Sequence, residues 1–276
     1  MFGDVIRKMK IVKNHFIRVC FMDFLANSLI VGCIAKAEAD AVTIDTTDIS
    51  KYNSTDGVIY GTGHIQSLAI SGEYADTCPQ LADAIMEHCT LKKEQSFSEF
   101  QTICDEAKRS YFENNRSYIA LLESDLQVMR ADEIVLSFLE YSKEYRGGAH
   151  EAFGYIGHNY NAKTGEKLSL EEIVDDADWF HSALYEALIV RYEHLGEDAI
   201  MPNTKKVCFD TEWDNFRWVM DQGGIYIIFN PYCLGSFAEG VFHVYLTFSD
   251  YPGMFSGQFL NNSKVWFEQN DVWLEH

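Results

Sequence analysis

Hydrophobic and polar residues follow two different periods along the chain, and each change of period marks a change of predicted secondary structure. Residues 42–75 are rich in β-branched positions between turn residues, which is typical of strands. From Pro79, which suits the first position of a helix, apolar residues recur at helical spacing. A polar interruption at 92–94 precedes Ser96 and Glu99, which have the spacing of a capping box. The pattern therefore predicts two consecutive helices.

The middle of the chain returns to strand periodicity. Residues 118–129 and 133–145 are predicted as two strands joined by a short turn at 130–132, and residues 152–160 as a third strand. The second of these strands has apolar residues on both faces. We therefore expect a sheet that is covered by helices.

Helix signals appear again after the third strand. Ser169 and Glu172 form a second capping box, and Asp178 is expected to cap a longer helix over residues 179–195. Three further strands are predicted at residues 216–220, 225–229 and 242–248, and an aromatic-rich edge segment at residues 265–274. Grouped hairpins and grouped helices predict an α+β fold, with antiparallel sheets and helices packed against them.

Composition identifies a folded, strongly acidic protein. The chain of 276 residues is 47% hydrophobic and 14% aromatic, and its net charge is −20. Residues 1–39 contain six basic and three acidic side chains, which leaves 16 basic and 39 acidic side chains and a net charge of −23 for the remainder. Such a charge repels nucleic acid and anionic membrane, and it favours basic partners. Acidity that only maintains solubility is the simpler interpretation.

The first 39 residues have the layout of a secretory signal. A basic stretch is followed by an apolar stretch at 19–35 and by small residues around Ala37 and Ala39, either of which could precede a cleavage site. We therefore predict export, with an extracytoplasmic location that is secreted, periplasmic or lipid-anchored. A buried N-terminal helix is the alternative.

A second signal lies inside the first. Ile30-Val31-Gly32-Cys33 resembles a bacterial lipobox, in which Cys33 would become the lipid-modified residue. Release as a soluble protein and lipid anchoring at Cys33 both stay open. Any membrane association is expected only through this N-terminal segment.

The seven cysteines form no metal pattern, because no CxxC pair occurs. An odd number leaves at least one free thiol in an exported chain, and disulfide pairing is not predicted. Cys78 and Cys89 are three helical turns apart, which is too far for a disulfide within one helix. We expect such helix-face cysteines to pack in the core.

Three short motifs carry a family resemblance. They are Tyr145-Arg146-Gly147-Gly148-Ala149-His150, the segment 160–174 with its threonine-glycine turn and leucine-rich helix start, and the segment 229–240, which contains Asn230-Pro231-Tyr232. Together they resemble the extracytoplasmic domain of RsiV-type anti-sigma factors, which respond to lysozyme. They are also similar to the non-catalytic N-terminal module of PdaC-type peptidoglycan deacetylases, a domain family of unknown function.

The resemblance implies an organisation. An N-terminal α+β companion domain would occupy residues 40–141, and a C-terminal α+β domain with the GGAH motif would occupy residues 142–276. Two departures are clear: Cys233 stands where the family usually has a glutamate, and neither a sigma-binding segment nor a zinc-dependent catalytic domain is expected in this chain. The resemblance thus implies the binding part of such proteins alone.

Candidate site residues come from the same motifs. We expect Tyr145, Gly147, Gly148, His150 and Tyr232 to contact a ligand. The two glycines are also expected to supply positive φ or close backbone approach, and the His150 ring to bond nearby backbone.

Recognisable catalytic and cofactor motifs are missing from the sequence. His150-Glu151 begins like a zinc-protease motif, but Gly154 stands where the second histidine should be. Gly61-Thr62-Gly63 lacks the third glycine and the helix of a dinucleotide loop. The acidic residues around Asp176 lack the spacing of an EF-hand, and acids are expected at helix starts. No catalytic residue, metal ligand or cofactor is therefore predicted.

The leading hypothesis is a non-enzymatic envelope module that binds peptidoglycan or a basic, lysozyme-like protein. A hydrolase acting on wall glycan or its acyl groups is the alternative, and it requires a cleft with facing carboxylates or a histidine–carboxylate pair. A purely structural envelope lipoprotein is a third.

Overall fold

The computed structural model describes residues 29–34, 41–52, 57–114, 117–192, 204–260 and 265–268, and for 29–34, Asn114 and Glu268 it describes the backbone alone. The predicted signal segment before residue 29 and the cleavage positions at Ala37 and Ala39 lie outside these ranges. The described chain is α+β, as the sequence predicts.

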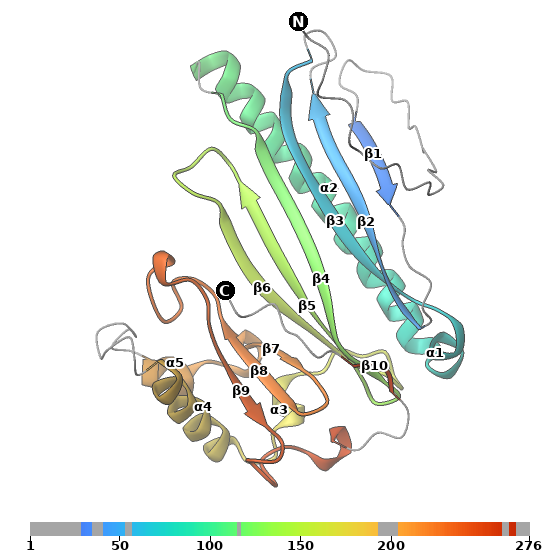
Figure 1. The fold of residues 1–276 in the computed structure, drawn as a ribbon, viewed down its shortest axis with the longest axis vertical. Helices are drawn as coiled ribbons and strands as arrows, with labels where there is room; N and C mark the ends of the chain where they lie inside the picture. The colour runs from blue at the N-terminus through green and yellow to red at the C-terminus, as the bar shows by residue number, and fades with distance from the viewer. Residues whose placement is uncertain are drawn as a thin grey trace, which may run out of the picture.

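A large sheet forms the centre of the molecule (Figure 1). Its strand order is β1 to β6 in sequence, and β10 pairs with one end of β4. All neighbouring strands are antiparallel except β3 and β4, which are parallel because the long helix α2 crosses between them. The strands are β1 (Leu29–Ile34), β2 (Val42–Tyr52), β3 (Ile59–Ile70), β4 (Ala120–Asp132), β5 (Val135–Tyr145), β6 (Ala152–Asn161) and β10 (Val265–Glu268).

A smaller antiparallel sheet packs at one end of the large one. Its strands are β7 (Arg217–Met220), β8 (Gly224–Phe229) and β9 (Phe242–Thr247). The helices are α1 (Gly72–Thr77), α2 (Pro79–Asn114), α3 (Leu170–Ile173), α4 (Ala177–Tyr192) and α5 (Thr204–Asp210), and short 3-10 turns occupy Trp213–Asn215, Phe237–Glu239 and Gly257–Phe259.

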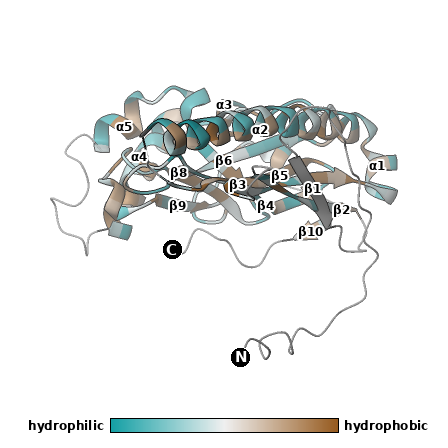
Figure 2. Cartoon of the chain, turned by 90° about the horizontal axis from the view of Figure 1, so that it is seen from above, coloured by the Kyte–Doolittle hydropathy of each residue, from teal (hydrophilic) through white to brown (hydrophobic). Residues whose placement is uncertain are grey.

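The elements form layers. Helix α2 lies along one face of the large sheet, as Figure 2 shows from above, with the sheet seen edge-on. At one end, the small sheet packs on the opposite face, where Val219 and Ile228 meet Met129 and Leu139. Helix α4 covers the outer face of the small sheet. The expectation of a sheet covered by helices is thus wrong for one face of β5, which a second sheet covers.

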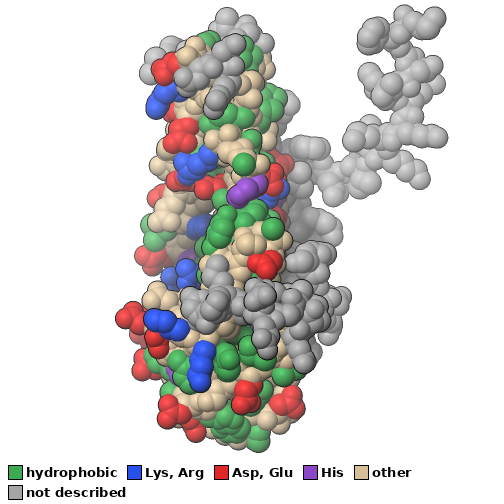
Figure 3. Space-filling model, turned by 90° about the vertical axis from the view of Figure 1, so that its left-hand side faces the viewer, with side chains coloured by type: hydrophobic (Ala, Val, Ile, Leu, Met, Phe, Trp, Pro, Cys, Tyr) green, Lys and Arg blue, Asp and Glu red, His purple; other side chains and the backbone are tan. Residues whose placement is uncertain are grey.

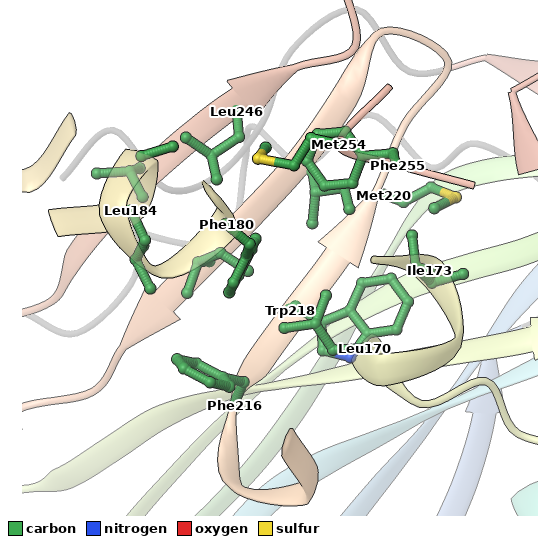
Figure 4. Packing of buried hydrophobic residues seen from close by; sticks show 14 of the residues in the cluster. Leu170, Ile173, Phe180, Leu184, Phe216, Trp218, Met220, Leu246, Met254 and Phe255 are labelled. Carbon is green, nitrogen blue, oxygen red and sulfur yellow. The ribbon is translucent and has the colours of Figure 1, made fainter. Parts of the chain in front are cut away.

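The largest buried cluster joins the small sheet to its helices (Figure 4). Phe180 and Leu184 of α4 point toward Trp218 and Met220, and Leu170 of α3 closes the side. Burial of apolar side chains contributes about 1.5–3 kcal/mol for each large one. This packing orders the small sheet and positions the loops that β8 and β9 carry.

Helix α2 is continuous, so the predicted break at 92–94 is wrong. Lysine and glutamate are good helix formers, and they do not interrupt a helix. Two of them reach the sheet: Lys92 Nζ lies 2.7 Å from Glu140, and Lys93 Nζ donates to Thr47 at 3.2 Å. Ser96 is buried in the helix and does not begin a new one.

Two boundaries also differ from the predictions. The turn between β4 and β5 is at residues 133–134, because Asp132 Oδ1 accepts from the backbone N–H groups of Ile134 and Val135. Helix α4 begins at Ala177, because Asp176 and not Asp178 accepts from the backbone of the first turn.

The other elements are confirmed where they are described. The helix starts at Pro79, the strand at 152–160 is β6, the Ser169–Glu172 capping box is present, and the hairpin of β7 and β8 is in place. The predicted boundary between residues 141 and 142 falls within β5, and the large sheet continues across it. The division into two domains stays a prediction.

Candidate binding face

The predicted ligand loop is the exposed connection between β5 and β6. Gly147 has a φ of +79°, and a Cβ there would lie 2.5 Å from the Tyr118 ring, so only glycine fits. A Cβ at Gly148 would meet nothing closer than 3.7 Å. The predicted requirement for glycine is therefore confirmed at Gly147 and wrong at Gly148.

The first part of this loop is braced by the protein itself. The Tyr145 hydroxyl donates to the Gly148 carbonyl at 3.1 Å. The Arg146 guanidinium pairs with Glu99 and Glu106 of α2. Tyr145 and Gly147 thus fix the shape of the loop, and their predicted contact with a ligand stays a prediction.

The second part of the loop meets the turn after β8. The His150 ring stacks on Phe237, with centroids 3.8 Å apart, and Tyr232 lies against the same phenyl ring at 5.7 Å. Phe153 contacts Phe237 edge-on at 5.4 Å. As expected, His150 Nδ1 also contacts nearby backbone, the Glu151 carbonyl at 2.9 Å. The structure thus brings together two predicted residues on Phe237.

Asn230 positions this aromatic group. Its side-chain amide donates to the Tyr155 carbonyl at 3.0 Å and accepts from the Tyr155 N–H at 2.8 Å, which ties the end of β8 to β6. Tyr232 follows with a φ of +73°, a left-handed conformation that is uncommon for a tyrosine. Its side chain is 63% exposed. Strained and exposed aromatic residues of this kind are found at functional sites.

Charged side chains continue the surface from this aromatic group across the sheet. Lys143 Nζ lies 3.0 Å from Glu151 and 3.6 Å from Glu123. On the neighbouring strands, His64 Nε2 lies 2.8 Å from Asp125. All five side chains are partly exposed.

We call this continuous surface the open face. It lies opposite α2, because Ser124 and Glu140 point toward α2 and successive strand residues alternate between faces. The ring centroids of Tyr141 and Phe153 are 6.1 Å apart, so Tyr141 joins the charged half of the open face to the aromatic half. The open face consists of His64, Glu123, Asp125, Tyr141, Lys143, His150, Glu151, Phe153, Tyr232 and Phe237.

Local electrostatics follow from these pairs. The hydrogen bond to Asp125 raises the pKa of His64, although burial opposes it. The hydrogen bond to Glu151 raises the pKa of Lys143. At neutral pH the open face still carries an excess of carboxylates. On another side of the molecule, Figure 3 shows acidic, basic and hydrophobic side chains interspersed along the whole length.

Two solved structures are similar to this arrangement of elements. One is a DUF3298 family member from Bacteroides fragilis, with a TM-score of 0.61 and 16% identity, which covers 79% of this chain and 95% of that chain. The other is a DUF3298 family protein from Pseudomonas aeruginosa PAO1, with a TM-score of 0.51 and 14% identity, which covers 88% of this chain and 99% of that chain. The chain shares the fold of DUF3298 family proteins. No family profile and no curated protein matches the sequence.

The other face of the central sheet in this DUF3298 fold holds a buried charged cluster. Glu140, whose side chain is 2% exposed, lies 2.7 Å from Lys92 and 3.0 Å from His158, and it accepts from the Ser124 hydroxyl at 3.1 Å. Burial alone would raise the pKa of Glu140, but His158 and Lys92 lower it to about 2. His88 stacks edge-on with His158, and burial lowers its pKa to about 4.

A cavity of about 450 Å³ opens along β6, beside this cluster. His158 and Asn159 line it from β6, Lys167 from the turn before α3, and Trp213 and Arg217 from the segment leading into β7. None of the five predicted ligand residues lines it. Sequence reasoning missed this site because its residues come from three distant segments.

Helix-face cysteines pack in the core as predicted, except that Cys89 is only partly buried, and Cys233 outside the helices is exposed. Cys78, Cys104 and Cys208 are buried and free, and burial raises the pKa of Cys104 and of Cys208 to about 12. Cys33 lies in β1, paired in register with Thr47 of β2. Within the described ranges, no helix is both long and apolar enough to cross a membrane, and no three acidic, histidine or cysteine side chains are grouped to hold a metal ion.

Proposed function

We propose that this protein is an exported envelope module that binds cell-wall material or a basic, lysozyme-like protein through the open face. The observation that carries this proposal is the continuity of the open face, which joins an exposed aromatic group to a row of carboxylates. Exposed aromatic groups are frequent anchors of binding surfaces. Carboxylates steer basic partners toward such a surface, and the chain's net charge of −20 adds to the effect.

The resemblance to RsiV-type ectodomains and to the PdaC-type module points in the same direction. His150 and Tyr232 come from the motifs that carry the resemblance, and both belong to the open face. Cys233 replaces the glutamate that is usual in that family, but the aromatic part of the open face does not depend on this position. Phe237 contacts both His150 and Tyr232 directly. We assign the module no catalytic role.

A binding experiment with lysozyme and with purified peptidoglycan tests the proposal. The wild type is expected to retain lysozyme at low salt and to release it at high salt, since exposed charges are screened. If wall material is the partner, the protein is expected to sediment with peptidoglycan instead. Binding to neither at low salt would contradict the proposal.

Matched variants separate the open face from general acidity. Phe237→Ala and the double change Glu123→Gln/Asp125→Asn are expected to weaken binding at least tenfold. Phe112→Ala and Glu87→Gln, on exposed positions of α2, are the controls and should leave it unchanged. Equal loss in both sets would show that binding is not located on the open face.

Export and anchoring are tested separately. In the predicted lipoprotein, radiolabelled palmitate is incorporated by the wild type and lost on Cys33→Ala, while Cys20→Ala retains it. Absence of label in the wild type would remove the anchor and leave release as a soluble protein.

A hydrolase is the second candidate, because a histidine–carboxylate pair, His158 and Glu140, stands beside a cavity. A hydrolase would release reducing ends or acetate from peptidoglycan, and this activity would be lost in the His158→Ala variant. Glu140 is already compensated by Lys92, which makes it a weak base. We therefore rank this function below binding.

A further inference from the structure

The cavity along β6 is unusual in its charge. Two basic side chains, Lys167 and Arg217, line it, and Asp214 is the one carboxylate among its lining residues. Arg217 Nη1 donates to the Asn215 carbonyl at 3.2 Å, and neither basic side chain forms an ion pair with a carboxylate in the described part of the chain. In a chain of net charge −20, this makes the cavity a local site for anions.

His158 adds a hydrogen-bonding group with a fixed role. Its Nε2 is committed to Glu140 at 3.0 Å, and Glu140 is held in turn by Lys92. Since Glu140 accepts, Nε2 carries a proton, and in the tautomer with this single ring proton Nδ1 is an acceptor. Within the described residues Nδ1 has no protein partner, and the ring is 11% exposed where it lines the cavity. A hydroxyl group of a ligand is the complementary donor.

An aromatic wall completes the cavity. The Trp213 indole is half-buried against Phe180 and His181, with ring centroids 5.5 Å and 5.1 Å away. Trp213 also lines the cavity, whose volume of about 450 Å³ is within the range of small-molecule sites. The supporting contacts hold the ring in place, so a ligand ring can pack on it at small entropic cost.

We propose that this cavity binds a carboxylate-bearing sugar. The carboxylate pairs with Arg217 and Lys167, a ring hydroxyl donates to His158 Nδ1, and the apolar edge of the sugar ring packs on Trp213. The site is separate from the open face and uses none of its residues. It therefore stands or falls independently of the binding function proposed for the open face.

D-glucuronate and D-glucose are the matched probes, because they differ only in the carboxylate. Binding to the full chain is measured by titration NMR at neutral pH and low salt. The wild type is expected to bind D-glucuronate at least tenfold more tightly than D-glucose. In the Lys167→Gln/Arg217→Gln variant, this preference is expected to fall to about one.

Control variants decide the remaining outcomes. Lys163→Gln changes an exposed lysine in the turn after β6 that does not line the cavity, and it should keep the tenfold preference. His158→Phe should weaken the binding of both sugars, because both offer the ring hydroxyl that donates to Nδ1. Circular dichroism checks that this variant folds. Equal affinity of the wild type for the two sugars, or no binding of either, overturns the proposal. So does a preference that survives loss of both basic side chains.

Discussion

The two faces of the large sheet each contain a histidine–carboxylate pair, yet the surroundings give the pairs different consequences. His158 and Glu140 are enclosed between the sheet and α2, with exposed fractions of 11% and 2%. His64 and Asp125 lie on the open face at 25% and 27%. The distances, 3.0 Å and 2.8 Å, are alike. Burial, and not the distance within the pair, therefore decides which pair contributes more to stability.

The largest expected effect comes from removing the buried charge. Glu140→Gln leaves Lys92 and His158 without their carboxylate, so the free energy of unfolding should fall by about 3 kcal/mol. Urea denaturation at pH 7 measures it. The control is Glu144→Gln, because Glu144 is partly exposed beside Arg146 and its loss should cost less than about 0.5 kcal/mol. Both carboxylates lie on the α2 side of β5 and differ in exposure, so equal effects of the two changes would contradict the role given to burial.

The next effect concerns the part of the opposite face that the small sheet covers. A Cβ at Gly157 would lie 1.8 Å from the Trp218 carbonyl oxygen, so Gly157→Ala should separate β6 from β7 and cost about 2 kcal/mol. Gly148→Ala is the matched change, since a Cβ there has space. Thermal unfolding of both variants checks this, and similar midpoints would contradict the close approach.

A smaller effect is a loss of stability in mild acid on the α2 face. Burial lowers the pKa of His88 from 6.5 to about 4, so the unfolded chain binds more protons between these values. Stability from His88 is therefore complete above pH 6.5 and decreases as pH falls toward 4. Between pH 7 and pH 5 the loss should be about 1 kcal/mol, and His88→Gln should reduce it. An unchanged pH dependence in that variant would place the titration elsewhere, for example at His243, whose pKa burial also lowers to about 4.

The smallest effect has the opposite sign and belongs to the open face. Because Asp125 raises the pKa of His64, the contribution of this pair is present below pH 6.5 and is lost as pH rises through the folded value. Its size should be about 0.5 kcal/mol, because both side chains are partly exposed. His64→Gln should therefore be more destabilising at pH 5 than at pH 8. NMR titration of the His64 ring measures its pKa. A value not above 6.5 would contradict this prediction.

Local signals were sufficient for most of the fold. The start of α2 at Pro79, the Ser169–Glu172 capping box and the hairpin of β7 and β8 each depend on neighbouring residues, so a sequence pattern predicts them. The break predicted in α2 was wrong because lysine and glutamate are themselves good helix formers. Lys92 looks like a surface residue in sequence, whereas its stem crosses the sheet face to reach a buried Glu140.

The candidate site was predicted less completely, because it is assembled from distant segments. His150 and Tyr232 carried motif signals, but Phe237 joins them through a contact that no spacing reveals. The charged half of the open face depends on the register of β3, β4 and β5. Asn230 offered a usable signal: an asparagine that ends a strand within a motif has an amide free to bond another segment.

The contacts of Asn230 also bear on association between copies of the protein. The last strand of a sheet offers backbone groups that a second molecule can extend into a shared sheet. In the described sheet β6 is such a strand, and Asn230 occupies both backbone groups of Tyr155. Further along β6, the Leu168 N–H donates to the Asn159 carbonyl, so this backbone group is also occupied. The residue that helps to display Tyr232 thus also occupies two backbone groups of this edge that a second molecule would need for pairing.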